Sequence, residues 1–390
     1  MMGNRLIESQ NTCQNLKPDL QSAVIDFLRF PLIIGVLLLH NYPTMVGVAT
    51  KQIGNNALFP VSTICRELFS QTLGRLSVPT FFFISGFLFF LHIDKFTGAV
   101  YVKKLKNRTK TLLIPYLFWN LLSLAAFYAV YHAPILSSYF SDTQEYTWHY
   151  LLQALWALPN DGIEVAKYPI AYQFWFIRDL MVMVILTPVV YFLVKKFRLY
   201  AVGILGILWF FGWWQLYFPW LAGQGLNIKA LFFFTAGAWF SINKRNFVDD
   251  ADKIAKWAFM LYPPIAIADV LTKLYIPNGQ YVCPSLINNS GILIGIVASF
   301  ALAAYLLKTG KAHVSTFLAS ASFFVFAVHE PLFLSRLRTR VFVIFRPESD
   351  GSLTAVYFLL VIVVTVVTLG LYWLLQRYLP KFTGVITGGR

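Results

Sequence analysis

The first apolar stretch of the chain, AVIDFLRFPLIIGVLLLHNY, carries Asp26, Arg29 and His40. Arg29 and His40 are 11 residues apart, so a helix places both on one face, about 16 Å apart along its axis. Asp26 lies one turn before Arg29 and can pair with it. A guanidinium binds phosphate or an oxyanion, and a neutral histidine can take a proton from a hydroxyl. A structural interpretation is also open, in which Asp26 and Arg29 form an ion pair and His40 caps the helix end.

Two later apolar stretches also contain charged side chains. YQFWFIRDL includes Trp175 and Arg178, and FFVFAVHEPLF includes His329 and Glu330 just before Pro331. Because a charge in hydrocarbon is costly, these side chains are candidates for the wall of a polar pocket. An interfacial ion pair and a satisfied structural histidine are the alternatives.

A basic run, YVKKLKNRTKTLLIPYLFW, leads into another apolar stretch and is expected to be a cytoplasmic loop. Its Lys104 and Arg108 are candidates for binding the phosphates of a nucleotide-bearing donor. Basic residues also collect at the inner ends of membrane spans for topological reasons alone, and that interpretation stays open.

The composition defines the elements that must position these residues. Hydrophobic residues make up 58% of the 390 residues and charged residues only 13%. A soluble domain usually has about 25% charged residues, so an ordinary water-soluble enzyme is excluded. The apolar blocks are about 20 residues long, enough to cross a bilayer as helices. They predict an all-α polytopic membrane protein with about ten transmembrane helices, at 21–42, 76–93, 110–132, 174–194, 200–218, 226–242, 254–276, 286–307, 314–335 and 353–378. Residues 43–75 and 133–173 are expected to form long outer loops.

The basic residues are sorted between alternate loops, which sets the predicted orientation. With a cytoplasmic N-terminus, 20 of the 32 Lys and Arg residues fall in inner segments. Both termini are therefore predicted to be cytoplasmic, with tails at 1–20 and 381–390 on either side of a single transmembrane domain at 21–380. The net charge of +15 is explained by this sorting and predicts lipid, not nucleic acid, as a partner.

One predicted outer segment, RLRTRVFVIFR, is basic and departs from this rule. It contains Arg336, Arg338, Arg340 and Arg346. Such a cluster can face an anionic glycan, lipid headgroups or a diphosphate carrier. It can also serve only to anchor the chain among headgroups.

Five segments, taken in order, resemble the membrane-bound acyltransferase-3 family, the integral membrane O-acyltransferases, in its stand-alone form. The matching elements are the spacing from Arg29 to His40, VPTFFFISGFLF with Ser85, KNRTKTLLIPYLFW with Arg108 and Tyr116, WFIRDL, and FFVFAVHEPLF. The family often has a second arginine three residues after the first in the third element, where this chain has Thr111.

The resemblance implies a bacterial inner-membrane enzyme. It would transfer an acyl group, usually acetyl, from a cytoplasmic coenzyme A thioester to a hydroxyl of an extracytoplasmic glycan or lipid-linked sugar. His40 is then the expected general base, and Arg29, oriented by Asp26, binds donor phosphate or the developing oxyanion. Acetyl-CoA is the expected donor substrate, with no permanently bound cofactor and no metal. Direct transfer and an acetyl-histidine relay are both open.

The resemblance also implies binding residues. Arg108, Lys104 and Tyr116 are expected at the acyl-CoA. The residues expected to contact substrate are Trp175, Arg178, Ser85, His329 and Glu330.

Two other classes of function fit the same charges. A transporter or flippase of a lipid-linked sugar or organic anion also needs intramembrane Arg, Asp and His, although no inverted repeat is evident in the sequence. A non-catalytic subunit of a glycan-assembly complex is the second. The oligomeric state and the identity of the acceptor stay open.

Overall fold

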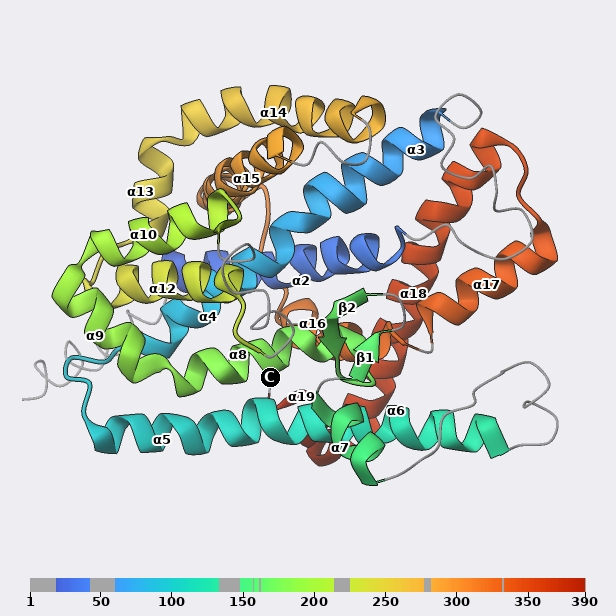
Figure 1. Ribbon diagram of the computed structural model, residues 1–390, viewed down its shortest axis with the longest axis horizontal. Coiled ribbons are helices and arrows are strands. Elements are labelled where there is room, and N and C mark those ends of the chain that lie inside the picture. Colours follow the sequence, from blue (N-terminus) through green and yellow to red (C-terminus); the bar gives the residue numbers. More distant parts are fainter. Residues whose placement is uncertain are drawn as a thin grey trace, which may run out of the picture.

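The computed structural model describes residues 19–42, 60–132, 148–156, 158–160, 163–213, 225–276, 282–331 and 333–389. Helices form most of this part of the chain (Figure 1). The predicted N-terminal tail lies, apart from its last two residues, outside the described residues. So do residues 43–59 of the first predicted outer loop and residues 133–147, 157 and 161–162 of the second.

Helix α2 (Leu20–His40) corresponds to the first predicted span and runs through the middle of the molecule (Figure 1). Pro31 lies inside it without ending it. Its buried face includes Val24, Leu28 and Val36, and it packs against helices on several sides, among them α16 (Thr316–Val328). The helix that carries the candidate residues is therefore held from several directions.

The second predicted span is longer at its N-terminal end than expected. A continuous helical segment covers Pro60–Phe90, made of α3 (Pro60–Arg66), the π-helical η1 (Glu67–Leu73), the 3-10 turn η2 (Gly74–Leu76) and α4 (Ser77–Phe90). The prediction of a loop over 43–75 is wrong for residues 60–75. Arg66, Glu67 and Arg75 lowered the apparent hydropathy there, yet Arg66 and Glu67 are buried between helices.

The basic run is also helical, so it is not an irregular loop, while its predicted cytoplasmic side stays a prediction. Helix α5 (Gly98–Arg108) continues through η3 (Thr109–Leu113) into α6 (Ile114–His132). Thr97 begins the helix by accepting a hydrogen bond from the Val100 amide at 3.3 Å. Lys and Arg are good helix formers and no Gly or Pro interrupts residues 99–114, so the charge of this segment does not end the helix.

The remaining helices follow the predicted spans with shifted ends. They are α8 (Trp175–Ile185), α9 (Thr187–Phe197), α10 (Leu199–Phe210), α12 (Ile228–Ile242), α14 (Ala255–Tyr275), α15 (Val282–Lys308) and α18 (Asp350–Tyr378). Outside the predicted spans lie α7 (Trp148–Trp156), the 3-10 turn η5 (Tyr172–Phe174), α13 (Phe247–Lys253), α17 (Leu334–Phe345) and α19 (Pro380–Thr387). A short antiparallel hairpin, β1 (Leu158–Asn160) and β2 (Ile163–Tyr168), lies in the second predicted outer loop.

In the described part of the chain, five helices are long and apolar enough to cross a membrane, or up to seven if two bent pairs count as one span each. The pairs are α8 with α9, bent by 61°, and α13 with α14, bent by 73°. Three more predicted spans correspond to the shorter apolar helices α10, α12 and α16. The chain is thus a multi-pass helical membrane protein, while the number ten and the side of the termini stay predictions.

Helices α4 and α12 make the closest helix contact in the aromatic core. At Gly86 an added Cβ would collide with the backbone of Phe234, and at Gly237 with the backbone of Phe83. Small residues allow helix backbones to approach this closely within a membrane. This close packing fixes the position of Ser85, which is the residue before Gly86 on α4.

The residues predicted as a C-terminal tail form α19, which packs against α6 and α18. The Trp119 indole donates to the Ile386 carbonyl at 2.9 Å. The end of the described chain, marked C, consequently lies over the middle of the molecule in Figure 1.

Candidate active site

A cavity of about 360 Å³ opens between α2, α4, the α5–η3 helix, α8 and α16. Five of the residues selected from the sequence line it: Arg29, His40, Ser85, Arg108 and Trp175. They come from four separate predicted spans or their approaches, so the fold brings together motifs that are far apart in the chain.

One face of α2 forms a wall of this cavity. Arg29, Ile33, Val36 and His40 all line it, at the spacing expected for one helical face. The predicted ion pair is present, with 3.1 Å between Arg29 Nη1 and Asp26 Oδ1. Both side chains are about one-third to two-fifths exposed, at 33% and 41%, so the pair leaves Arg29 open to a ligand.

The His40 ring lies between two other rings at the end of α2. Its centroid is 5.3 Å from that of Tyr172 and 5.1 Å from that of His329. The backbone carbonyl of His40 accepts a hydrogen bond from Arg338 Nη1 at 3.1 Å. That guanidinium satisfies a terminal carbonyl of α2 and complements the negative end of the helix dipole.

His329 lies behind His40 and is fully buried. Its Nδ1 is 2.7 Å from the Phe326 carbonyl oxygen. A carbonyl only accepts, so Nδ1 carries the proton and Nε2 has the lone pair. Among the described residues, Nε2 has no hydrogen-bond partner. His329 does not line the cavity, but it supplies an unused acceptor next to the His40 ring.

Glu330 is also buried behind the cavity and not in its wall. Its carboxylate oxygens each accept from the Ser335 hydroxyl at 2.7 Å. Gln173 donates to the backbone carbonyls of Ala327 (at 3.1 Å) and Glu330. These contacts fix the segment that carries His329 against the start of α8.

Two of the selected residues are directed elsewhere. Arg178 pairs with Asp179 at 2.9 Å and donates to the Trp156 carbonyl, also at 2.9 Å, and both members of the pair are buried. The Tyr116 hydroxyl donates to the Leu155 carbonyl at 2.5 Å. Neither side chain lines the cavity. Their contacts connect α6 and α8 to α7.

Of the two basic residues selected from the basic run, Arg108 lines the cavity wall and Lys104 does not. Lys104 lies one turn before Arg108, and its amino group is 5.7 Å from the centre of the Phe89 ring. Thr111, at the position where the family often has its second arginine, lines the cavity beside Arg108.

Sequence reasoning missed several cavity residues, including Gln173, Ser322, Gly388 and Gly389. Gly388 has a φ of 72°, and a side chain there would collide with the backbone of Thr111. A pair of glycines after an apolar helix signals a helix end. Nothing in the sequence around Gly388 and Gly389 predicts that this helix end lies in the same cavity wall as Arg108.

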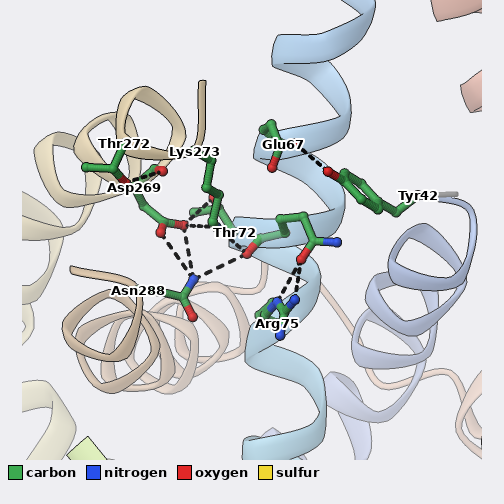
Figure 2. Close-up of polar contacts among 9 residues, drawn as sticks. Tyr42, Glu67, Thr72, Arg75, Asp269, Thr272, Lys273 and Asn288 are labelled. Carbon is green, nitrogen blue, oxygen red and sulfur yellow. Dashed lines mark hydrogen bonds and ion pairs between the residues drawn. The ribbon is translucent and has the colours of Figure 1, made fainter. Parts of the chain in front are cut away.

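A second group of charged residues lies on the other side of η1, and we call Thr72, Asp269, Lys273 and Asn288 the Asp269 cluster (Figure 2). Asp269 accepts from Thr72 at 2.6 Å, Lys273 at 2.5 Å and Asn288 at 3.1 Å. Nearby, Tyr42 donates to Glu67 at 2.7 Å and Arg75 to the Gln71 side chain at 2.8 Å. No sequence motif pointed to this cluster, whose members come from three separate helices.

No group of three His, Cys, Asp or Glu side chains in the described ranges is arranged to hold a metal ion. The cavity chemistry is that of a histidine, two arginines and hydroxyl or amide groups in an otherwise apolar wall.

Fold and cavity together define a multi-pass membrane protein with a polar site enclosed by its helices. The chain belongs to the acyltransferase domain family called acyltransferase-3, whose model matches residues 23–377. It is therefore a membrane acyltransferase, and the family resemblance predicted from the five motifs is confirmed. It is 24% identical over 369 residues to the succinoglycan biosynthesis protein ExoH of Rhizobium meliloti, a match covering 95% of this chain and 92% of the relative. No solved structure matches the chain.

Proposed function

We propose that this chain is an inner-membrane O-acyltransferase that moves an acetyl group from cytoplasmic acetyl-CoA to a hydroxyl of an extracytoplasmic glycan or lipid-linked sugar. The observation that carries the proposal is the single cavity lined by Arg29 and Arg108 and also by His40. The name of the relative, a succinoglycan biosynthesis protein, supports a polysaccharide as the molecule that is modified.

In this mechanism the two arginines bind the phosphates of the donor. Arginine forms strong, paired hydrogen bonds with phosphate oxygens. Arg29 lies about 16 Å from His40 along α2, which is too far to stabilise an oxyanion formed beside His40. Phosphate binding is therefore the better role for Arg29. The pantetheine arm then extends through the apolar part of the cavity, past Ile33 and Val36.

His40 acts as the general base on the acceptor hydroxyl. The hydroxyl oxygen attacks the thioester carbonyl as its proton passes to the imidazole, and a C–O bond forms. Collapse of the tetrahedral intermediate breaks the C–S bond, and the His40 proton neutralises the departing thiolate. Proton transfer of this kind contributes about 10²–10⁴-fold to a rate.

His329 and Glu330 act as positioning groups in this proposal, not as direct contacts of the substrate. The lone pair on His329 Nε2 lies beside the His40 ring and can orient the imidazolium that forms. Glu330 accepts from Ser335, and its backbone carbonyl accepts from Gln173, next to Tyr172, which is the second ring against His40. Trp175 and Ser85 remain as substrate contacts because both line the cavity.

The test is single-turnover transfer from radiolabelled acetyl-CoA to surface glycan by the purified protein. His40→Ala should abolish the transfer, while His313→Ala, a histidine outside the cavity with an exposed side chain, should leave it unchanged. Transfer that persists in His40→Ala removes His40 from the mechanism. Substrate uptake into proteoliposomes without transfer favours a transporter.

Unchanged glycan modification in cells carrying Arg29→Ala, at equal protein level, favours a non-catalytic subunit. Mass spectrometry of surface glycans with and without the protein identifies both the acyl group and its carrier.

A further inference from the structure

Arg75 lies inside the helical segment Pro60–Phe90, yet its side chain is exposed. Figure 2 shows it beside the Asp269 cluster. Its Nε and Nη2 atoms both donate to the Gln71 side-chain oxygen, at 2.8 and 2.5 Å. Among the described residues, Arg75 forms no ion pair with a carboxylate. One edge of the guanidinium is therefore used, and the edge that carries Nη1 is free for a ligand.

Lys229, in the first turn of α12, is a second cation at the same end of the bundle. The C-terminal ends of α4 and α12 meet, because Lys244 pairs with Asp94 at 2.7 Å. The two helices therefore run parallel, which places Arg75 and Lys229 at their common N-terminal end. The charge of Arg75 acts on Lys229. In the described part of the chain, the partly exposed Lys229 amino group has no hydrogen bond and no ion pair.

We call Arg75 and Lys229 the cation pair. The carboxylates near it are already used. Asp269 and Glu67 both act on the guanidinium of the pair, but Asp269 is bound to Lys273 and Glu67 accepts from Tyr42. With Lys273 included, three positive groups here face two carboxylates. An excess of positive charge between membrane helices is costly, and it marks a place where an anion can bind.

A close helix contact brings the cation pair near the His40 end of α2. An added Cβ at Gly74 would be 2.8 Å from the Gly35 carbonyl oxygen and 3.6 Å from Leu39 Cβ. Arg75 follows Gly74, and His40 follows Leu39, so the two residues flank one contact between helix backbones. The cation pair is not part of the wall of the His40 cavity. A group bound by the pair is therefore a second point of contact and not the reacting group.

We propose that the cation pair binds a carboxylate of the glycan acceptor, while a hydroxyl elsewhere on the same glycan reacts at His40. This inference rests on the proposed function, and it selects an acidic saccharide over a neutral one. A carboxylate has two oxygens, one for the open edge of the Arg75 guanidinium and one for the Lys229 ammonium. A lipid phosphate is the other source of such an anion, and the test distinguishes the two.

The test uses the full-length protein in phosphatidylcholine nanodiscs, with radiolabelled trigalacturonate and its neutral methyl ester as matched probes. Wild-type protein should bind the acid at least about tenfold more tightly than the ester, because only the acid forms charge-assisted contacts. Arg75→Gln/Lys229→Gln should lose this preference and bind both probes as the wild type binds the ester. The matched control, Lys195→Gln/Lys196→Gln, removes two exposed charges from the last turn of α9 and should keep the preference.

A wild-type protein that does not prefer the acid overturns the proposal, and so does a double variant that keeps the preference. Displacement of the acid by phosphatidylglycerol in the nanodisc also overturns it, because the bound anion is then a lipid headgroup.

Lys229→Met separates binding from folding. The substitution leaves no described group unpaired and removes the repulsion from Arg75. The thermal midpoint in detergent should therefore stay the same or rise, while the preference for the acid falls. A lower midpoint would assign Lys229 to the fold and contradict the proposal.

Binding does not require acyl transfer, so these results can be read even if the proposed function fails. Where transfer is active, the double variant should raise KM for an acidic acceptor and leave KM for acetyl-CoA unchanged.

Discussion

The cavity around His40 and the Asp269 cluster both place charged side chains among apolar helices, but they use those side chains differently. In the cluster, the Asp269 carboxylate is 1% exposed and accepts from its own helix α14 and from two others, η1 and α15 (Figure 2). In the cavity, Arg29 has one carboxylate partner and remains 33% exposed on a wall of open space. A charge in a membrane span is therefore a candidate for chemistry only when its hydrogen-bonding capacity is not consumed by the protein. The first group holds helices together, and the second is available to a ligand.

The largest expected difference is between His40→Ala and Asp269→Ala in catalysis. His40→Ala should lower the transfer rate by about 10²–10⁴-fold because the base is lost, with little change in the thermal midpoint in detergent. Asp269→Ala should leave the rate per folded molecule close to wild type. Rates from labelled acetyl-CoA, normalised to the folded fraction, measure both. A catalytic loss in Asp269→Ala as large as in His40→Ala would remove the distinction between the two regions.

For stability, the expected order is reversed, and Asp269→Ala should have a larger effect than His40→Ala. Asp269→Ala leaves Lys273 without its carboxylate in a largely buried position, which should lower the free energy of unfolding by about 3–5 kcal/mol. Asp252→Ala is the matched control, since Asp252 pairs with Lys308 while its side chain is 50% exposed; exposed pairs contribute about 0–1 kcal/mol. Thermal and denaturant unfolding of the purified variants measure both. Equal losses would show that the cluster is no more than a surface ion pair.

A smaller effect should separate Arg108 from its basic neighbours. Arg108→Gln should raise KM for acetyl-CoA about tenfold, the effect of losing one charge-assisted contact, and leave kcat nearly unchanged. Lys106→Gln, on the same helix but outside the cavity, should have no effect. With acetyl-pantetheine, which lacks the phosphates, Arg108→Gln and wild type should behave alike. A defect that persists with this donor would place Arg108 in packing and not in phosphate binding.

The smallest effect should come from the glycine pair that lines the cavity together with Thr111 and Arg108. Gly388 and Gly389 both have a φ of 72°, but only at Gly388 would a Cβ collide with Thr111. Each alanine substitution should therefore lower stability by about 1–2 kcal/mol from the left-handed backbone. Gly388→Ala should in addition raise the donor KM several-fold by displacing Thr111 beside Arg108. An equal KM for acetyl-CoA in the two variants would show that the end of α19 does not affect donor binding.

Local sequence was sufficient where a property depends on one helix. The period of the α-helix placed Arg29 and His40 on one face and Asp26 beside Arg29, and the structure has both arrangements. It was insufficient where charge lowered the apparent hydropathy, since residues 60–75 and the basic run of α5 are helical in the structure. Arg66 and Glu67 are buried there by neighbouring helices. A hydropathy average over consecutive residues contains no information about helices that are distant in the chain.

By itself, then, the sequence determined the class of protein, the family and the face of α2 that lines the cavity, because composition and helical period are carried by consecutive residues. Only the tertiary structure decided which charges face the cavity. Arg108 lines it while Arg178, in an equally polar motif, is bound to Asp179 and the Trp156 carbonyl. Gln173, Thr111 and Gly388 join the site from segments with no motif of their own. Their positions follow from how helices distant in the chain pack together, and that packing is decided by shape and by pairing of polar groups across the bundle.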